Sequence, residues 1–178
     1  FFGKPGLGKT WLGMELSLSV ACGIPWYGLP TTAAKVLYFN LELPNWTMQN
    51  RLNTLINRMA GAVVYDEQIP IMEAREKLME EHFHLLTAED LQGRINILDN
   101  AMVCHLQEAC TSIQPRLLVI DALSRIHETD ENSAEKFGQV LARLDTLRLS
   151  TRCAILLIHH DRKGNGDAHG KGDEMDAL

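Results

Sequence analysis

The chain lacks a long hydrophobic run. In 178 residues, no uninterrupted apolar stretch approaches the roughly 20 residues that a membrane-spanning helix requires. A membrane-spanning protein is therefore not expected.

The chain also lacks paired cysteines. Its four cysteines, Cys22, Cys104, Cys110 and Cys153, form no C-x-x-C pair and have no metal-type spacing. We interpret them as reduced thiols in the core, where a free cysteine behaves as a small hydrophobic residue. This pattern fits a cytoplasmic compartment best.

An excess of positive charge is missing as well. The chain has 17 lysines and arginines against 23 aspartates and glutamates, which gives a net charge of -6. The domain as a whole therefore does not have the basic surface of a protein that holds nucleic acid by itself. Any contact with nucleic acid must be local, or must combine a few cations from each of several subunits.

The pattern that is present predicts one α/β domain. Three apolar runs without polar alternation read as buried parallel strands, and 83–86 is a weaker fourth. Helical spacing separates them, which implies crossover helices around a mostly parallel sheet in three αβα layers. The predicted strands are 36–41, 117–121 and 154–159, and the predicted helices are 11–22, 46–59, 73–81, 91–113 and 134–149.

A glycine-rich motif opens the chain and predicts a triphosphate site. It reads Gly3-Lys4-Pro5-Gly6-Leu7-Gly8-Lys9-Thr10, a full G-x-x-x-x-G-K-[ST] loop. Its glycines let backbone N–H groups curl around an anion, and the following helix N-terminus adds partial positive charge. Lys9 supplies a charge for the β- and γ-phosphates, Thr10 offers a hydroxyl to Mg²⁺, and Trp11 continues the nucleotide site. A chance glycine-rich turn is the disfavoured alternative.

Only Phe1 and Phe2 precede this motif, although such a loop follows a buried strand. We therefore expect residues 1–178 to be a single domain that is cut inside its first strand and before its C-terminal strands.

Polar residues follow the predicted strands at the edge where open parallel sheets bind ligands. Asp121 ends a Walker B-like run, where a carboxylate holds Mg²⁺ opposite Thr10, and a turn-capping aspartate is the alternative. Glu42 and the pair His159-His160 follow the neighbouring runs. Ala122, not a glutamate, comes directly after Asp121, so a second carboxylate for water activation must lie elsewhere.

Together these segments resemble the plasmid RepA-type hexameric replicative helicases, a RecA-like family of P-loop ATPases. The resemblance spans nearly the whole chain and rests on the strand-tip glutamate, the sequence after Asp121, the acidic stretch at 128–132 and the His-His-x-x-Lys ending. The matching segments are 3–10, 36–44, 117–124 and 155–163.

The resemblance implies roles for individual residues. Glu42 would be the catalytic base, with a glutamate near a helix N-terminus as the alternative. His160, in preference to His159, would contact the γ-phosphate, with a structural histidine pair as the alternative. Arg51, nine residues after the glutamate, would stack on the adenine or remain a solvated helix arginine. A neighbouring subunit's arginine finger is expected beyond Leu178.

The resemblance also implies a homo-oligomeric ring, expected to be a hexamer, around single-stranded DNA. Of the two loops that would face the channel, 127–135 is acidic and a poor phosphate ligand. The second loop carries Arg162, Lys163, His169 and Lys171 on a glycine-rich backbone. Six copies would form a ring of cations, although a loop with incidental charge is an equal alternative.

The sequence thus predicts an ATP-hydrolysing motor domain that uses ATP and Mg²⁺ and moves on single-stranded DNA. Two alternatives stay open. One is a RecA-like recombination or repair ATPase that forms filaments, and the other is an ATP-binding regulatory module with little hydrolysis.

Overall fold

A computed structural model of the chain describes residues 1–63, 81–90, 95–128 and 133–160. Its five strands form one sheet in the order β1-β5-β4-β2-β3, and every ladder is parallel. The strands are β1 (Phe2–Gly3), β2 (Val36–Asn40), β3 (Phe83–Thr87), β4 (Leu117–Asp121) and β5 (Ala154–His160). The three apolar runs and the weaker fourth are confirmed as strands.

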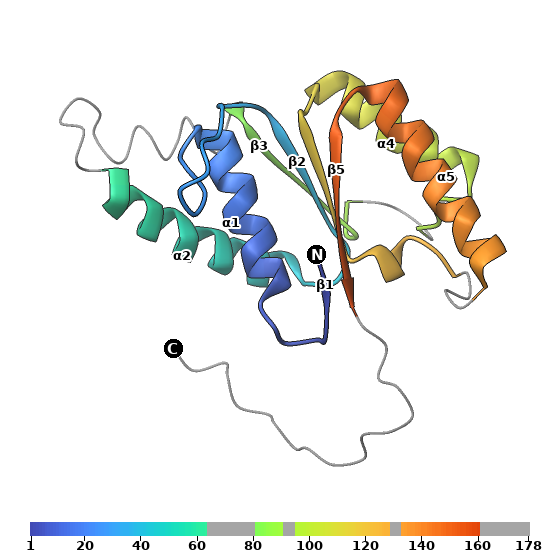
Figure 1. The fold of residues 1–178 in the computed structure, drawn as a ribbon, viewed down its shortest axis with the longest axis horizontal. Helices are drawn as coiled ribbons and strands as arrows, with labels where there is room; N and C mark the ends of the chain where they lie inside the picture. Colours follow the sequence, from blue (N-terminus) through green and yellow to red (C-terminus); the bar gives the residue numbers. More distant parts are fainter. Residues whose placement is uncertain (64–80, 91–94, 129–132, 161–178) are drawn as a thin grey trace, which may run out of the picture.

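Helices cover both faces of the sheet. Helices α1 (Lys9–Cys22) and α2 (Asn45–Val63) lie on one side, and α4 (Asn100–Ile113) and α5 (Ala134–Thr151) lie on the other (Figure 1). A single 3₁₀ turn, Leu123–Arg125, follows β4. The predicted three-layer α/β architecture is confirmed. The predicted helix at 73–81 lies almost entirely outside the described residues.

Alternation along the strands builds two cores from one sheet. Val36 and Tyr38 of β2 pack toward α1 and α2, whereas Leu37 and Phe39 pack toward α4 and α5. All five residues of β2 are buried because the strand has neighbours on both sides and helices on both faces. This central position makes the carboxyl end of β2 a fixed point for the site.

The start of α4 differs from the prediction of a helix over 91–113. Within the described residues, α4 begins at Asn100, and Asp99 caps it by accepting a hydrogen bond from the Ala101 N–H at 3.0 Å. Ile97 is fully buried, and its N–H donates to the Ile126 carbonyl at 2.7 Å. The apolar residues before the cap thus pack as a turn, which periodicity alone does not distinguish from a helix.

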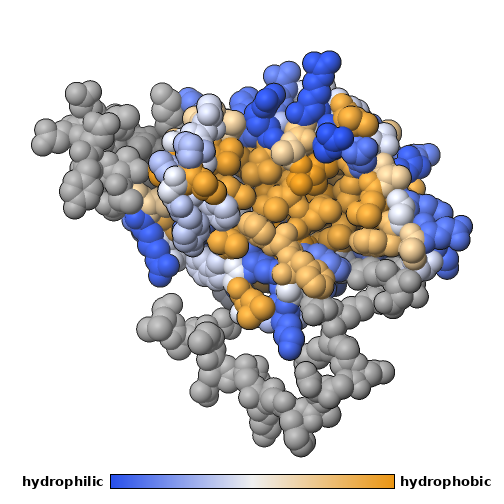
Figure 2. All heavy atoms as spheres, in the orientation of Figure 1, coloured by the Kyte–Doolittle hydropathy of each residue, from blue (hydrophilic) through white to orange (hydrophobic). Residues whose placement is uncertain are grey.

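Strand β5 is less buried than predicted. Its ladder with β1 covers only His159 and His160, so in the described part of the chain its first residues pair with β4 alone. Ile155, Leu156 and Leu157 are consequently half-buried. Figure 2 shows apolar surface between the two helical layers, on the face where Figure 1 places β1 and β5.

The cysteines are all free, but they are not all in the core. Cys110 and Cys153 are buried, Cys22 is half-buried, and Cys104 lies on the exposed face of α4. The prediction of a core thiol is therefore wrong for Cys104, because the apolar positions of α4 that face the sheet are Met102, Val103 and Leu106 instead. Among the described helices, none is long and apolar enough to cross a membrane.

Candidate functional site

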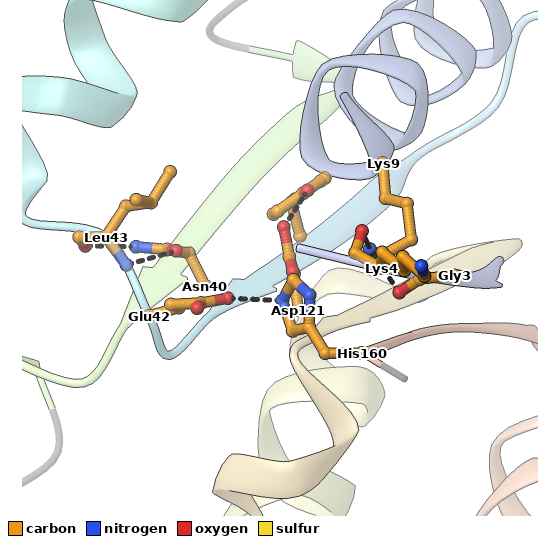
Figure 3. A network of polar contacts seen from close by, with 9 residues as sticks. Gly3, Lys4, Lys9, Asn40, Glu42, Leu43, Asp121 and His160 are labelled. Carbon is orange, nitrogen blue, oxygen red and sulfur yellow. Dashed lines mark hydrogen bonds and ion pairs between the residues drawn. The ribbon is translucent and has the colours of Figure 1, made fainter. Parts of the chain in front are cut away.

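The glycine-rich loop joins β1 to α1 and curls around the Lys9 amine. Gly6 and Gly8 have φ values of 79° and 75°, left-handed conformations that glycine adopts without strain. Lys9 Nζ donates to the carbonyls of Gly3 at 2.7 Å and Lys4 at 2.6 Å (Figure 3). Gly8 caps α1 without a side chain, so no side-chain cap competes for the first N–H groups of the helix. The loop therefore concentrates positive charge at one point.

Strand order brings the other candidate residues to this loop. β5 lies between β1 and β4, and Gly3 pairs with His160 in the β1–β5 register. Asp121 pairs with Asn40 on β2, two residues before Glu42. Because all strands are parallel, their carboxyl ends meet at one edge. Glu42, Asp121 and His160 consequently face a common region beside the loop.

Asp121 is the most buried charged group of the site. Its exposed fraction is 0%, and Oδ2 accepts a hydrogen bond from the Tyr38 hydroxyl at 2.8 Å. Oδ1 has no hydrogen-bond partner among the described residues. Burial raises the pKa of Asp121 above its usual value, while the Tyr38 and Thr10 hydroxyls counteract that shift. The group is a buried carboxylate with one oxygen still to be satisfied.

Glu42 is positioned by the residue at the end of β2. Asn40 is fully buried, and its side chain accepts from the Leu43 N–H at 3.1 Å and donates to the Leu43 carbonyl at 2.6 Å. This Asx-type turn fixes the backbone on both sides of Glu42. The Glu42 carboxylate then lies 2.8 Å from Nε2 of His160 (Figure 3). Since a carboxylate can only accept, Nε2 is the donor.

The alternative to catalysis for Glu42 is an acidic side chain that stabilises the N-terminus of α2, and in the structure Glu89 lies at that position. Glu89 accepts from the Asn45 N–H at 3.4 Å and from the Asn45 side-chain amide at 2.6 Å. Asn45 is the first residue of α2. An acidic group therefore does lie at this helix terminus, but it comes from the loop after β3.

The two histidines at the end of β5 point in different directions, as neighbours on a strand do. His160 contacts Glu42, whereas the His159 ring packs on Phe2 with 5.3 Å between ring centroids. The geometry therefore joins His160 to the strand-end carboxylate of Glu42.

The donor set beside the loop fits Mg²⁺. The unsatisfied Oδ1 of Asp121 and the Thr10 hydroxyl are hard oxygen donors, which Mg²⁺ prefers. Asp121 and Thr10 are thus the residues that would hold the ion.

Arg51 and Trp11 also meet. The Arg51 guanidinium lies 5.1 Å from the centroid of the Trp11 ring, a cation–π distance. Both line a pocket of about 790 Å³ between α1, α2 and the loop at 24–29. Trp26, Tyr27 and Arg58 line it as well. Its size and aromatic lining suit a planar base.

Two positioning residues were missed by sequence reasoning. Asn40 is a polar residue inside an apolar run, directly before a strand end, and that signal was available. Tyr38 carries no such signal, because a tyrosine in an apolar strand is usually core. The candidate DNA contacts Arg162, Lys163 and Lys171 lie outside the described residues.

Comparison of the chain with models of protein families identifies the family to which it belongs. A family model described as an AAA domain matches residues 1–166. The chain belongs to this family. It is accordingly a P-loop ATPase domain, in agreement with the loop, the parallel sheet and the polar strand ends described above.

Proposed function

We propose that this AAA domain is the ATP-hydrolysing motor of a ring-forming, RepA-type replicative helicase that acts on single-stranded DNA. The observation that carries the catalytic part is the 2.8 Å contact between Glu42 and His160, directly beside the buried Asp121 and the phosphate loop. A strand-tip glutamate in this place suits water as the nucleophile. The helicase part rests on the family resemblance of the sequence.

Binding is the task of the loop and the base pocket. The amides of residues 3–10 and the Lys9 amine hold the phosphates, and Arg51 with Trp11 stacks on the adenine. Thr10 and Asp121 would hold Mg²⁺, which would supply positive charge against the negative charge that develops on the phosphates during transfer.

Hydrolysis is the task of Glu42. Its carboxylate accepts a proton from water as the water oxygen attacks the γ-phosphorus, and the bond to the bridging oxygen breaks to release ADP. The Asn40 turn fixes the backbone beside Glu42 and so holds its carboxylate within reach of the attacking water. A misplacement of about 1 Å costs roughly 10²-fold in rate, so this turn is part of the machinery.

His160 links the nucleotide to the base. Its Nε2–H donates to Glu42, and an anionic γ-phosphate oxygen is a competing acceptor for the same hydrogen. Binding of the triphosphate then redirects the imidazole and leaves Glu42 to orient water. Loss of the γ-phosphate restores the Glu42 contact, and the end of β5 reports the change to the loop that follows.

Glu42→Gln tests the catalytic assignment. Turnover should fall by about 10²- to 10⁴-fold while ATP binding persists, because the amide still fits the site but accepts no proton. Glu89→Gln is the matched control, since Glu89 is a nearby exposed carboxylate that accepts hydrogen bonds from Asn45 at the start of α2. Full turnover in Glu42→Gln would show that the base lies elsewhere.

Stimulation of ATP hydrolysis by single-stranded DNA distinguishes a DNA-dependent ATPase from a regulatory module. A helicase or a recombination ATPase hydrolyses ATP faster with DNA, whereas a regulatory module does not. Electron microscopy with a non-hydrolysable ATP analogue distinguishes closed rings from filaments. A lack of stimulation together with a lack of rings would contradict the helicase proposal and leave the AAA ATPase domain intact.

A further inference from the structure

The three strand-end side chains also form a candidate site for a transition metal. We infer that Glu42, Asp121 and His160 together bind a late first-row divalent cation such as Zn²⁺, in a ligand set that shares Asp121 with the Mg²⁺ site but replaces Thr10 with Glu42 and His160. One ligand atom from each of the three residues lies within 4.8 Å of the others. They come from the ends of β2, β4 and β5 and converge in Figure 3.

A second observation points to a ligand here. Asp121 is fully buried, and its Oδ1 has no hydrogen-bond partner among the described residues. A buried, unsatisfied carboxylate oxygen costs free energy that a cation recovers. The site therefore has an inner carboxylate that is in place before any ion arrives.

The donor types select the metal. One imidazole nitrogen and two carboxylates suit Zn²⁺, which binds nitrogen and oxygen at about 2.0–2.2 Å and often keeps three protein ligands with an open position. Mg²⁺ prefers oxygen ligands alone. A site that includes His160 should thus retain Zn²⁺ in the presence of excess Mg²⁺.

The geometry needs little adjustment. Adjacent ligands of a tetrahedral ion with bonds of this length lie roughly 3.3 Å apart. The His160 and Glu42 atoms are already 2.8 Å apart, so the cation takes the place of the hydrogen between them. The Glu42 side chain is 33% exposed and has room to rotate toward Asp121.

Zn²⁺ bound at this site should affect ATP hydrolysis, an expectation that rests on the proposed function. The cation would bind the carboxylate that accepts the proton from water and the aspartate that holds Mg²⁺. Zn²⁺ should then inhibit ATP turnover at concentrations at which it saturates the site, even with Mg²⁺ in excess.

Calorimetric titration of Zn²⁺ into the nucleotide-free protein, with excess Mg²⁺ present, tests the binding itself. The wild-type protein should bind one Zn²⁺ per chain at this site. His160→Gln keeps an N–H donor for Glu42 but loses the imidazole ligand. Its affinity for Zn²⁺ should fall by at least roughly ten- to a hundredfold, because the loss of a mere hydrogen-bond partner of a metal ligand already has an effect of that size. Unchanged affinity in His160→Gln would overturn the inference.

The control is His105→Gln, which makes the same substitution at an exposed histidine of α4. It should bind Zn²⁺ like the wild type, and equal weakening in both variants would overturn the inference. Asp121→Asn is the second site variant, and its melting curve verifies that it is folded. It should also lose affinity, and wild-type affinity in the folded variant would count against the site.

Co²⁺ provides a spectroscopic readout in place of Zn²⁺. A site of imidazole and carboxylates gives no thiolate charge-transfer band, whereas binding at exposed Cys104 would give one and would overturn the inference.

The metal-site inference and the catalytic proposal can be disproved independently of each other. Zn²⁺ binding that ignores His160→Gln removes the metal site alone, while full ATP turnover in Glu42→Gln removes the catalytic proposal alone.

Discussion

Tyr38 donates a hydrogen bond of 2.8 Å to Asp121 from the adjacent strand, and both side chains are fully buried. Burial is the main reason that the pKa of Tyr38 lies well above its ordinary value, and the Asp121 carboxylate raises it further. Tyr38 therefore stays a neutral donor near neutral pH. It holds one oxygen of Asp121 and leaves the other for a cation.

Tyr38→Phe should destabilise the protein by about 1–3 kcal/mol, because it leaves a buried carboxylate oxygen without its donor. Denaturant unfolding measures the loss. Tyr27→Phe is the control, since Tyr27 is 72% exposed and its hydroxyl donates a solvent-exposed hydrogen bond to the Glu15 carboxylate at 3.2 Å. It should stay within about 0.5 kcal/mol of the wild type. Equal effects in the two variants would contradict a special role for the Tyr38–Asp121 bond.

Asp121→Asn should raise the melting temperature at neutral pH while it abolishes Mg²⁺-dependent turnover. The folded-state pKa of Asp121 is raised by burial, so the native protein binds this proton more tightly than the unfolded chain does. Stability therefore decreases as pH rises from the ordinary aspartate pKa of 3.8 through the raised pKa of the folded state, and the amide removes this cost. Each kcal/mol corresponds to about 2–4 °C for a chain of this size.

The pH dependence is the sharper part of that prediction. Below the unfolded pKa, Asp121 is protonated in both states, so the advantage of Asp121→Asn should shrink toward acid pH. Melting curves at several pH values measure this difference. An advantage that is constant across pH would mean that desolvation of the carboxylate is not its cause.

Lys9→Ala should reduce ATP turnover by at least about 10²-fold, because the loop loses the charge that its carbonyls hold in place. Direct nucleotide binding and steady-state turnover both report the change. Lys136→Ala, at an exposed position of α5, removes the same charge at a distance and should keep wild-type activity. Similar losses in both variants would indicate a general electrostatic effect.

Arg51→Ala should weaken ATP binding by roughly two- to fivefold, in line with about 0.5–1 kcal/mol for an exposed cation–π contact. Affinity for inorganic tripolyphosphate should not change, because that ligand has no base to stack. The comparison of the two ligands is an internal control. If both affinities fall together, Arg51 contacts phosphate and not the base.

Asn40→Ala should lower turnover by about 10²-fold with little change in ATP affinity, because it releases the turn that positions Glu42. Steady-state kinetics separate kcat from KM. Asn53→Ala, at an exposed position of α2, is the matched control and should be neutral. Normal kcat in Asn40→Ala would show that Glu42 does not depend on this turn.

Local pattern was sufficient for much of the fold and for the phosphate loop. Apolar runs without alternation specify buried parallel strands, and a glycine-rich loop before a helix specifies an anion site, because both depend on neighbouring residues alone. The same pattern was wrong at 95–99. Apolar residues there pack as a turn against Ile126, a contact between segments that periodicity does not contain.

The sequence by itself determined that this chain has a phosphate loop, a parallel sheet and ionisable residues after three of its strands. Only the tertiary structure decided how those residues pair. Strand order places β5 between β1 and β4, which brings His160 to Glu42, and the pairing of β3 with β2 puts Glu89 at the start of α2. The physical reason is that strand order and register join residues more than a hundred positions apart, and hydrophobic packing over the whole sheet selects that order.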